Sequence, residues 1–332
     1  MGQNSISAVR VSIGTAAVLG LLKIKLDAQP TTAYLMTYKE GKCTANCAFC
    51  PQAKGSSSNT ERLSRVSWPT FPTQAVIAAL SLAVEKERIR RICIQALNYP
   101  EVFCHLEVLV KEIKKCCKVS VSVSCQPQNR EAIDRLKVAG VDRLGIALDA
   151  ATETVFSSVK GSGVGSCYIW EKQFRLLSEA LEIFGKGNVS THVIVGLSET
   201  EMEVVEIVQR CTDMGVLPAL FAFTPVRGTA LEGSLPPKVE SYRRIQLARY
   251  LIVNCKAKVQ DMNFSVDGKI SGFGLPSDTL EPVIESGIPF RTSGCPDCNR
   301  PYYNEKPSGP FYNYPRSLNK EEIKAAKREL AH

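Results

Sequence analysis

Three cysteines near the start of the chain have a spacing suited to metal chemistry. Cys43, Cys47 and Cys50 lie in the segment KCTANCAFCPQ at 42–52, with three and then two residues between them. Iron–sulfur clusters are held by cysteine thiolates, usually four of them. No fourth cysteine or histidine is close in the sequence, so the spacing predicts a 4Fe-4S cluster with one iron free for another ligand. A closed zinc site is the alternative, and it would need that fourth ligand.

The composition limits the kind of protein that carries this segment. The chain has 332 residues, of which 44% are hydrophobic and 22% charged, with 13 cysteines and three histidines. Such a chain can bury a large core, and mechanisms that need several histidines are disfavoured. Disulfide-rich chains are typically small and exported, and the N-terminal stretch predicts no export signal. We therefore predict a cytoplasmic protein with reduced thiols.

The N-terminal stretch and the net charge indicate which kinds of partner the protein can bind. The apolar stretch at 12–22 is too short to span a membrane and predicts a buried helix or a lid. The net charge is +8, and the 41 basic and 33 acidic residues are spread along the chain. A solvated surface accounts for this spread, and an anionic partner would also suit it. We expect no membrane association and no nucleic-acid partner.

Strand and helix patterns alternate through the middle of the chain. Segments rich in β-branched residues predict six strands, at 31–37, 91–95, 119–124, 143–148, 189–195 and 217–224. Helical patterns lie between them, at 73–86, 102–116, 129–138, 168–184 and 199–214. This order predicts a parallel sheet with helices outside, and six units favour a partial barrel over a complete eightfold one.

Two further observations complete the expected architecture. Valine and serine alternate from Val119 to Ser124, which favours a strand with one face under helices and one toward a polar interior. An open sheet with an exposed polar face is the alternative.

After Gly228 the alternation of strands and helices stops, and helices are predicted at 238–254 and 319–330 on either side of a tail rich in Gly, Pro and Tyr. We expect an N-terminal helical extension at 1–29, the partial barrel at 30–235 and a C-terminal extension at 236–332.

The cysteine segment, with Phe49 directly before its last cysteine, resembles the cluster loop of the radical S-adenosylmethionine (SAM) superfamily. The resemblance implies an α/β fold, a partial (β/α)6 TIM-like barrel of the radical SAM type. It also implies that Cys43, Cys47 and Cys50 are the catalytic residues and hold a 4Fe-4S cluster whose free iron binds SAM. One-electron reduction then cleaves SAM to a 5′-deoxyadenosyl radical, which removes hydrogen from an unactivated carbon.

Further segments at the predicted strand ends are similar to SAM-binding segments of the same superfamily. Gln95 stands where a Gly-Gly-Glu segment is common, and that motif is absent here. Asp149 ends a Leu-Asp pair like the one near the SAM ribose in biotin synthases, and a helix cap is its alternative role. The resemblance thus implies a set of cofactor-binding residues, namely Phe49, Gln95, Asp149, Gly196 in the segment near adenine, and Arg227 in a turn similar to Gly-Thr-Pro.

The order and spacing of these segments are close to those of biotin synthases. Those enzymes hold a second, sulfur-donating cluster inside the barrel with three cysteines and an arginine. Of the three corresponding cysteine positions only Cys93 is a cysteine here, since Ser122 and Ser190 occupy the other two. This departure argues against biotin synthase itself.

A second pair of cysteines lies in the tail, in the segment RTSGCPDCNR at 291–300. Cys295 and Cys298 make half of an iron–sulfur or zinc site, and a tight turn with two free thiols is the alternative. The preceding Arg-Thr-Ser resembles the Arg-Ser-Ser segment of lipoyl synthases, whose serine caps an auxiliary cluster. The resemblance therefore implies a second 4Fe-4S cluster held by Cys295, Cys298 and Ser293, with Cys93 and Cys125 as open candidates for further ligands.

The tail as a whole resembles that of the archaeal and bacterial two-component lipoyl synthases. This resemblance implies a sulfurtransferase that inserts sulfur into an unactivated carbon of an octanoyl-lysyl carrier domain, without deciding between C6 and C8. The implied partners are the octanoylated lipoyl carrier protein or domain, a second radical SAM lipoyl synthase component, and an electron donor such as ferredoxin or flavodoxin. The alternatives are a methylornithine-synthase-like mutase or maturase without a sacrificial cluster, and a zinc-bound scaffold without turnover.

Overall fold

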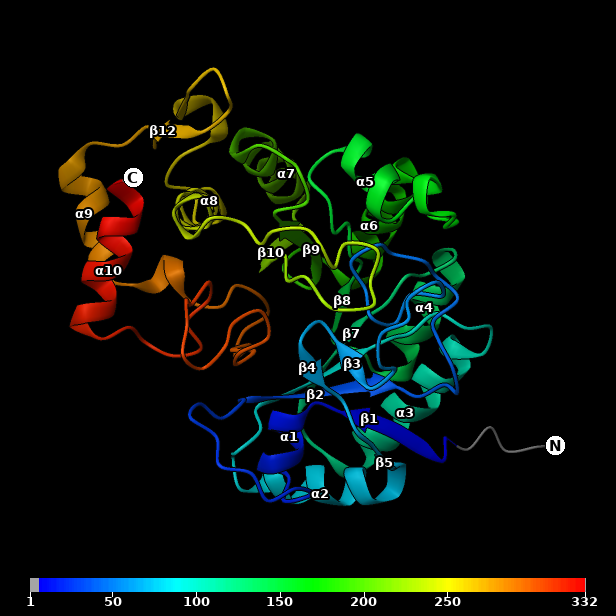
Figure 1. Cartoon of the computed structure of the whole chain (residues 1–332). Helices are drawn as coiled ribbons and strands as arrows, with labels where there is room; N and C mark the ends of the chain where they lie inside the picture. The colour runs from blue at the N-terminus through cyan, green and yellow to red at the C-terminus, as the bar shows by residue number, and fades with distance from the viewer. Residues whose placement is uncertain (1–5, 332) are drawn as a thin grey trace.

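The structure is a computed structural model that describes residues 6–331. Its centre is a parallel sheet surrounded by helices (Figure 1). In the described residues the parallel strands follow one another in the order β2 (Thr32–Thr37), β6 (Arg91–Gln95), β7 (Ser120–Ser124), β8 (Arg143–Gly145), β9 (Val189–Val195) and β10 (Leu217–Ala222). All six are the predicted strands, and the predicted partial barrel is confirmed.

The helices that connect these strands lie where the sequence places them. They are α2 (Thr73–Glu85), α3 (Val102–Cys116), α4 (Arg130–Ala139), α6 (Trp170–Phe184) and α7 (Glu201–Met214), with a short unpredicted helix α5 (Glu153–Val159) after β8. Local signals set their ends. Thr200 and Glu203 form a capping box at the start of α7, and Gly215 ends it with a φ of 89°.

Strand β7 shows why the barrel has a polar interior. Val121 and Val123 are buried in the core at 0% and 1% exposure. Ser122 and Ser124, on the opposite face, line the central cavity. The predicted separation of an apolar outer face from a hydroxyl-bearing inner face is therefore confirmed.

The N-terminal extension adds a strand as well as a helix. Strand β1 (Ala8–Val11) pairs antiparallel with β2 and with β5 (Thr70–Pro72), so the sheet has eight strands in the described residues and is open between β5 and β10. Helix α1 (Ile13–Val18) follows within the predicted apolar stretch. The first five residues of the predicted 1–29 extension lie outside the described residues. The sequence indicated only a helix here, because four residues are too few to show an alternation.

The open side of the sheet is occupied by a hairpin and by the C-terminal extension. The hairpin joins β3 (Arg62–Leu63) to β4 (Val66–Ser67). The extension contains α8 (Val239–Val253), β11 (Asn263–Phe264), β12 (Ile270–Gly272), α9 (Ser277–Glu285) and α10 (Lys320–Ala331). Figure 1 shows α8 beside α7, with α9 and α10 beyond it. The loop at 291–319, which we call the tail loop, returns toward the barrel. Among the helices of residues 6–331, none combines the length and the hydropathy that crossing a membrane requires.

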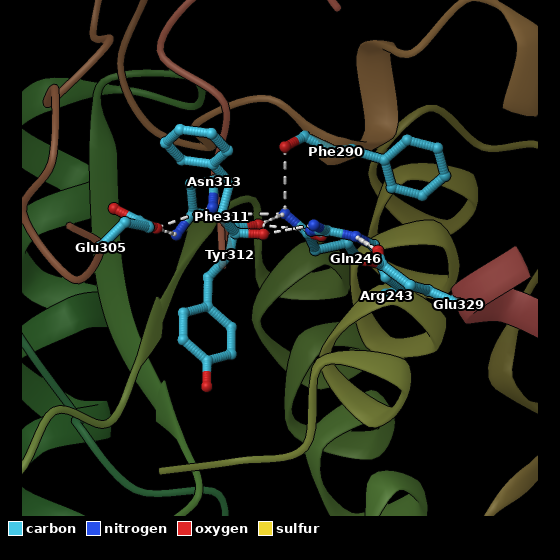
Figure 2. Close-up of polar contacts among 8 residues, drawn as sticks. All are labelled: Arg243, Gln246, Phe290, Glu305, Phe311, Tyr312, Asn313 and Glu329. Atoms are coloured by element: carbon cyan, nitrogen blue, oxygen red, sulfur yellow. Dashed lines mark hydrogen bonds and ion pairs between the residues drawn. The ribbon is translucent and has the colours of Figure 1, made fainter. Parts of the chain in front are cut away.

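Buried polar contacts hold the tail against α8 (Figure 2). Arg243, at 0% exposure, donates from Nη1 to the carbonyl of Tyr312 at 2.6 Å and from Nε to Glu329 of α10 at 2.7 Å. Gln246 donates from Nε2 to the carbonyls of Tyr312 and Phe290, at 2.9 and 3.3 Å. We call these contacts the tail latch. Because buried carbonyls need partners, the latch fixes both ends of the segment that carries the tail cysteines.

A buried carboxylate organises the same segment from inside. Glu305, at 3% exposure, accepts hydrogen bonds from the backbone and side-chain nitrogens of Asn313, at 2.7 and 3.0 Å. The Asn313 side-chain oxygen accepts in turn from Tyr242 of α8 at 3.1 Å. Burial raises the pKa of Glu305. The loop between Glu305 and Asn313 is therefore closed by its own side chains as well as by the latch.

Candidate active site

A cavity of about 520 Å³ lies inside the barrel. Its wall contains the three cysteines of the segment 42–52, which we call the cluster loop, and also Cys93, Cys295 and Cys298. The cluster loop follows β2, so it lies at the carboxyl ends of the strands. The tail cysteines approach from the amino ends, because the carbonyl of Asp297 accepts from the hydroxyl groups of Thr31 and Thr32 at the start of β2. Two groups of thiols therefore border one cavity from opposite ends.

Backbone hydrogen bonds shape the cluster loop. The amide of Cys43 donates to the carbonyl of Gln52 at 2.9 Å, and the amide of Cys50 donates to that of Cys47 at 3.0 Å. The sulfur of Cys43 accepts from the amide of Asn98, just after β6, at 3.2 Å. These bonds turn the loop back on itself and attach it to the neighbouring strand. All three thiols consequently face the cavity.

Burial controls the ionisation of two of these thiols, those of Cys47 and Cys50. It raises the pKa of Cys50 to about 12 and raises that of Cys47 further. The positive charge of Lys160 acts in the opposite direction on Cys47, and that of Lys42 on Cys50, without overcoming burial. Metal binding would displace the thiol protons, since thiolates are the ligands. The loop therefore carries a set of three soft sulfur donors that fits iron.

The arrangement suits a cluster of several irons. Within residues 6–331, no three His, Cys, Asp or Glu side chains are gathered closely enough to share a single ion. An iron–sulfur cluster binds each cysteine through a different iron, so its thiols need not meet at a single ion. Cys43, Cys47 and Cys50 would hold such a cluster, as the sequence predicts.

Asp149 is held by a buried lysine beside the cluster loop. The Nζ of Lys160 lies 2.7 Å from a carboxylate oxygen of Asp149 and 2.5 Å from the carbonyl of Ala147. Asp149 and Lys160 are 9% and 1% exposed and line the cavity. The alternative role of Asp149 as a helix cap is not adopted, because Thr152 caps α5 by accepting from the amide of Val155. No motif in the sequence predicts a role for Lys160, and its one signal is a lone basic residue in an otherwise uncharged stretch.

The other predicted cofactor-binding residues divide into two groups. Phe49 and Gln95 line the cavity. Gln95, however, donates from Nε2 to the sulfur of Cys93 at 3.2 Å, because residues two apart in a strand share a face. Phe49 lies in the cluster loop, and Gln95, at the carboxyl end of β6, contacts the thiol of Cys93.

Gly196 and Arg227 lie outside the cavity wall. Gly196 ends β9 with a φ of 104°, and a β-carbon there would lie 2.8 Å from the ring of Pro237. Its need for glycine is thus explained by backbone conformation and packing. Arg227 is exposed. Their predicted contact with SAM stays a prediction that the cavity lining does not support.

His192 lies in the cavity wall between the two thiol groups. Its ring packs against that of Phe221, with centroids 4.8 Å apart. Burial lowers the pKa of His192 to about 4, so the imidazole is neutral at neutral pH. This placement agrees with a packed barrel histidine rather than with a charged group.

The fold brings Cys93 to the tail cysteines. Burial raises the pKa of Cys93, and the neighbouring Cys295 and Cys298 raise it further. Cys295 accepts from the hydroxyl group of Ser122 at 3.9 Å, and Cys298 lies 3.4 Å from the hydroxyl oxygen of Tyr34. We call Cys93, Cys295 and Cys298 the inner thiol group. The sequence left the membership of Cys93 open, and tertiary contacts place it here.

Cys125 does not join the inner thiol group. It borders the cavity but is only 4% exposed and packs in the hydrophobic core. Burial raises the pKa of Cys125, with no contribution from another thiol. Ser293 does lie in the wall near the group, where its hydroxyl oxygen accepts from the amide of Leu220 at 2.8 Å.

Arg300 supplies a positive charge beside the inner thiol group. Its Nη2 donates to the carbonyl of Ser293 at 2.5 Å, and the guanidinium stacks 3.8 Å from the ring centroid of Phe221. Its Nε is buried without a hydrogen-bond partner among residues 6–331. A half-buried guanidinium with a buried, unused Nε donor beside three thiols fits an anionic cluster. No pattern in the sequence predicted this role for Arg300.

The sequence profile of the Radical SAM superfamily matches residues 41–211, just over half of the chain. This range contains the cluster loop, Asp149 and Lys160. The chain belongs to the radical SAM superfamily. Membership implies a 4Fe-4S cluster and SAM as cofactors, and this radical SAM protein is therefore an enzyme.

Similar proteins in the curated collection include biotin synthases. The biotin synthase of Sulfurihydrogenibium sp. (strain YO3AOP1) is 25% identical over 199 residues, which cover 59% of this chain and 56% of that protein. The biotin synthase of Lysinibacillus sphaericus is 27% identical over 262 residues, covering 76% and 72%. The radical SAM chain thus spans little more than half the length of the first of these relatives.

Solved structures share the fold. Methylornithine synthase (PylB) has a TM-score of 0.50 at 13% identity, over 81% of this chain and 87% of that chain. HydG, a maturase of the FeFe-hydrogenase, has a TM-score of 0.53 at 14% identity, over 68% and 51%. Both agree with the partial barrel of this radical SAM enzyme.

Proposed function

We propose that this radical SAM enzyme inserts sulfur into an unactivated carbon of an octanoyl-lysyl carrier domain, as one component of a two-component lipoyl synthase. The observation that supports sulfur insertion is the inner thiol group in the wall of the cavity that the cluster loop also borders. A radical mutase would need only the thiols of the cluster loop. The tail segment at 291–300 supports the lipoyl type, through its resemblance to lipoyl synthases.

The two ends of the cavity have different tasks in this proposal. At the cluster loop, the 4Fe-4S cluster and SAM supply abstraction of a hydrogen atom from carbon. Asp149, fixed by Lys160, would orient SAM, and the neutral His192 leaves the centre of the cavity uncharged.

The inner thiol group would hold the second cluster. Cys93, Cys295 and Cys298 supply three ligands, and Ser293 is the nearest predicted candidate for a fourth. Arg300 would offer its unused Nε–H to the cluster and offset its negative charge. The proposal also includes the octanoylated carrier, a second radical SAM component and an electron donor such as ferredoxin or flavodoxin.

Iron and sulfide per chain, measured after anaerobic reconstitution, test the second cluster. We expect about eight of each for two 4Fe-4S clusters, and about four of each in Cys93→Ala, Cys295→Ala and Cys298→Ala. These variants should also lose the sulfur-containing product of an octanoylated carrier peptide, detected by mass spectrometry. Cys116→Ala, which removes an exposed thiol on α3, is the matched control and should retain iron and product.

Two results would overturn the proposal. About four iron ions per wild-type chain, with SAM cleavage but no sulfur product, would support the methylornithine-synthase-like mutase or maturase. Stoichiometric zinc without iron or SAM cleavage would support the scaffold.

A further inference from the structure

The cavity reaches the surface beside the N-terminal extension. Among the described residues that line it, the exposed ones are Ile13, at 38%, and Pro307. Ile13 begins α1, and Pro307 lies in the tail loop. The opening is therefore bordered by the two extensions, away from the cluster loop.

The wall next to this opening is apolar. The N-terminal extension and the hairpin contribute Ile13, Leu26, Ala28, Pro30, Leu63, Val66 and Trp68. Among the described residues that these segments contribute, the charged side chain is Arg65, and its Nη1 is directed to the carbonyls of Tyr302 and Glu305. Arg65 is thus engaged by carbonyls of the tail, and the other lining side chains of these segments are uncharged.

Contacts across the opening hold its walls together. The hydroxyl group of Tyr302 in the tail donates to Asp27 in the N-terminal extension. The hydroxyl group of Ser64 in the hairpin donates to the carbonyl of Tyr303 at 3.4 Å. Three separate segments are therefore joined at this opening, and joined walls lower the ordering cost of binding a flexible chain.

We propose that this passage binds a linear saturated acyl chain, with its attached lysyl group at the surface between Ile13 and Pro307 and its far carbons directed toward the inner thiol group. The inference rests on the proposed function for the identity of the chain. An acyl chain attached to a carrier needs an opening to the surface, and its methylene groups gain affinity from burial against apolar walls.

Binding of acylated peptides to the reconstituted full-length protein tests the passage without requiring turnover. The probes are fluorescently labelled lysyl peptides that carry a butanoyl, hexanoyl or octanoyl group. We expect affinity to rise about fourfold for each methylene. Ile13→Glu should weaken binding of the octanoyl peptide about tenfold or more, because it places a charge in the passage. Ile13→Trp should narrow the entrance and raise the KM for the octanoyl peptide.

Ile24→Glu is the matched control. Ile24 lies in the same extension, is 43% exposed and is outside the cavity wall. This variant should bind the octanoyl peptide as the wild type does. Three results would overturn the proposed passage. They are equal weakening of binding by Ile13→Glu and Ile24→Glu, no effect of Ile13→Glu, and a wild-type affinity that does not depend on acyl length.

The same measurements separate this inference from the proposed function. If the wild type binds acyl peptides in the expected order but forms no sulfur product, the passage stands and the proposed function fails. If the wild type forms the product while both Ile13 variants keep the wild-type KM, the proposed function stands and the passage is wrong.

Discussion

Lys160 connects the cluster loop to Asp149. Its ammonium group is buried against the carboxylate and the carbonyl of Ala147, and its charge acts on the thiol of Cys47. Asp149 adopts a φ of 69°, which is uncommon for a residue with a side chain. A conformation of this kind persists where surrounding contacts determine it, and the ion pair is one such contact.

Removing the lysine tests its role as a positioning residue. In Lys160→Met we expect weaker SAM binding, by about tenfold, because Asp149 loses the partner that orients it. The unpaired buried carboxylate should also lower the free energy of unfolding by about 3–5 kcal/mol. Equilibrium dialysis with SAM and denaturant unfolding measure the two effects.

Two further variants control this prediction. Lys160→Arg should recover part of the SAM affinity, since it keeps the charge. Arg130→Met breaks the exposed pair between Arg130 and Glu182 and should leave both quantities near those of the wild type. Unchanged SAM affinity in Lys160→Met would show that the pair is only structural.

Helix α8 determines where the tail cysteines lie. It carries both side chains of the tail latch, and the latch binds the carbonyls of Phe290 and Tyr312 on either side of the tail cysteines. At the other end, Arg91 at the start of β6 donates from Nε to the carbonyl of Pro296 at 3.0 Å. The irregular tail is thus fixed by regular elements, as a precise ligand geometry requires.

Breaking the tail latch should displace the tail cysteines and so weaken iron binding at the inner thiol group. Gln246→Leu removes one hydrogen bond from each of the carbonyls of Tyr312 and Phe290, which keep those from Arg243 and from the amide of Tyr314. For the two bonds lost we expect the free energy of unfolding to fall by about 1–3 kcal/mol. We also expect iron per chain to fall below the wild-type value, because the inner thiol group is displaced. Gln74→Leu, on the exposed face of α2, is the control and should change neither quantity. Wild-type iron content in a destabilised Gln246→Leu would mean that the latch does not position the cysteines.

At the scale of the whole molecule, the barrel separates two chemical ends and leaves its side open. The cluster loop covers the carboxyl ends of the strands, the tail cysteines enter at the amino ends, and the two extensions border the opening. The chain as a whole carries a net charge of +8. A positively charged surface favours association with an acidic carrier domain, mainly through the rate of encounter.

This charge predicts a salt dependence for the proposed carrier reaction. Raising the salt concentration from about 0.05 to about 0.5 M should raise the KM for an acidic octanoylated carrier domain several-fold, because screening shortens the range of electrostatic attraction. The KM for a short uncharged octanoyl-lysyl peptide should change by less than about twofold, since it uses only the passage. Equal changes for the two substrates would contradict docking by charge.

Local patterns predicted most of the fold and the first thiol group. The six parallel strands and their helices follow from periodicity and end signals such as Thr200 and Gly215, which act within a few residues. Strand β8 ends at Gly145, earlier than predicted, and within the remainder of the predicted strand the amide of Leu148 donates to the hydroxyl group of Thr191 instead of a backbone carbonyl. Strand β1 escaped prediction because its pairing with β2 and β5 is not visible in four residues.

By itself the sequence determined the cluster loop, since a loop of 11 residues at 42–52 contains its whole donor set. Only the tertiary structure decided that Cys93 joins Cys295 and Cys298, that Lys160 holds Asp149 and that Cys125 stays in the core. These outcomes depend on burial and on contacts between segments far apart in the chain. Bringing distant segments together costs chain entropy, and burial of the entire core offsets that cost. The spacing of residues within one segment does not reveal which distant segments will meet.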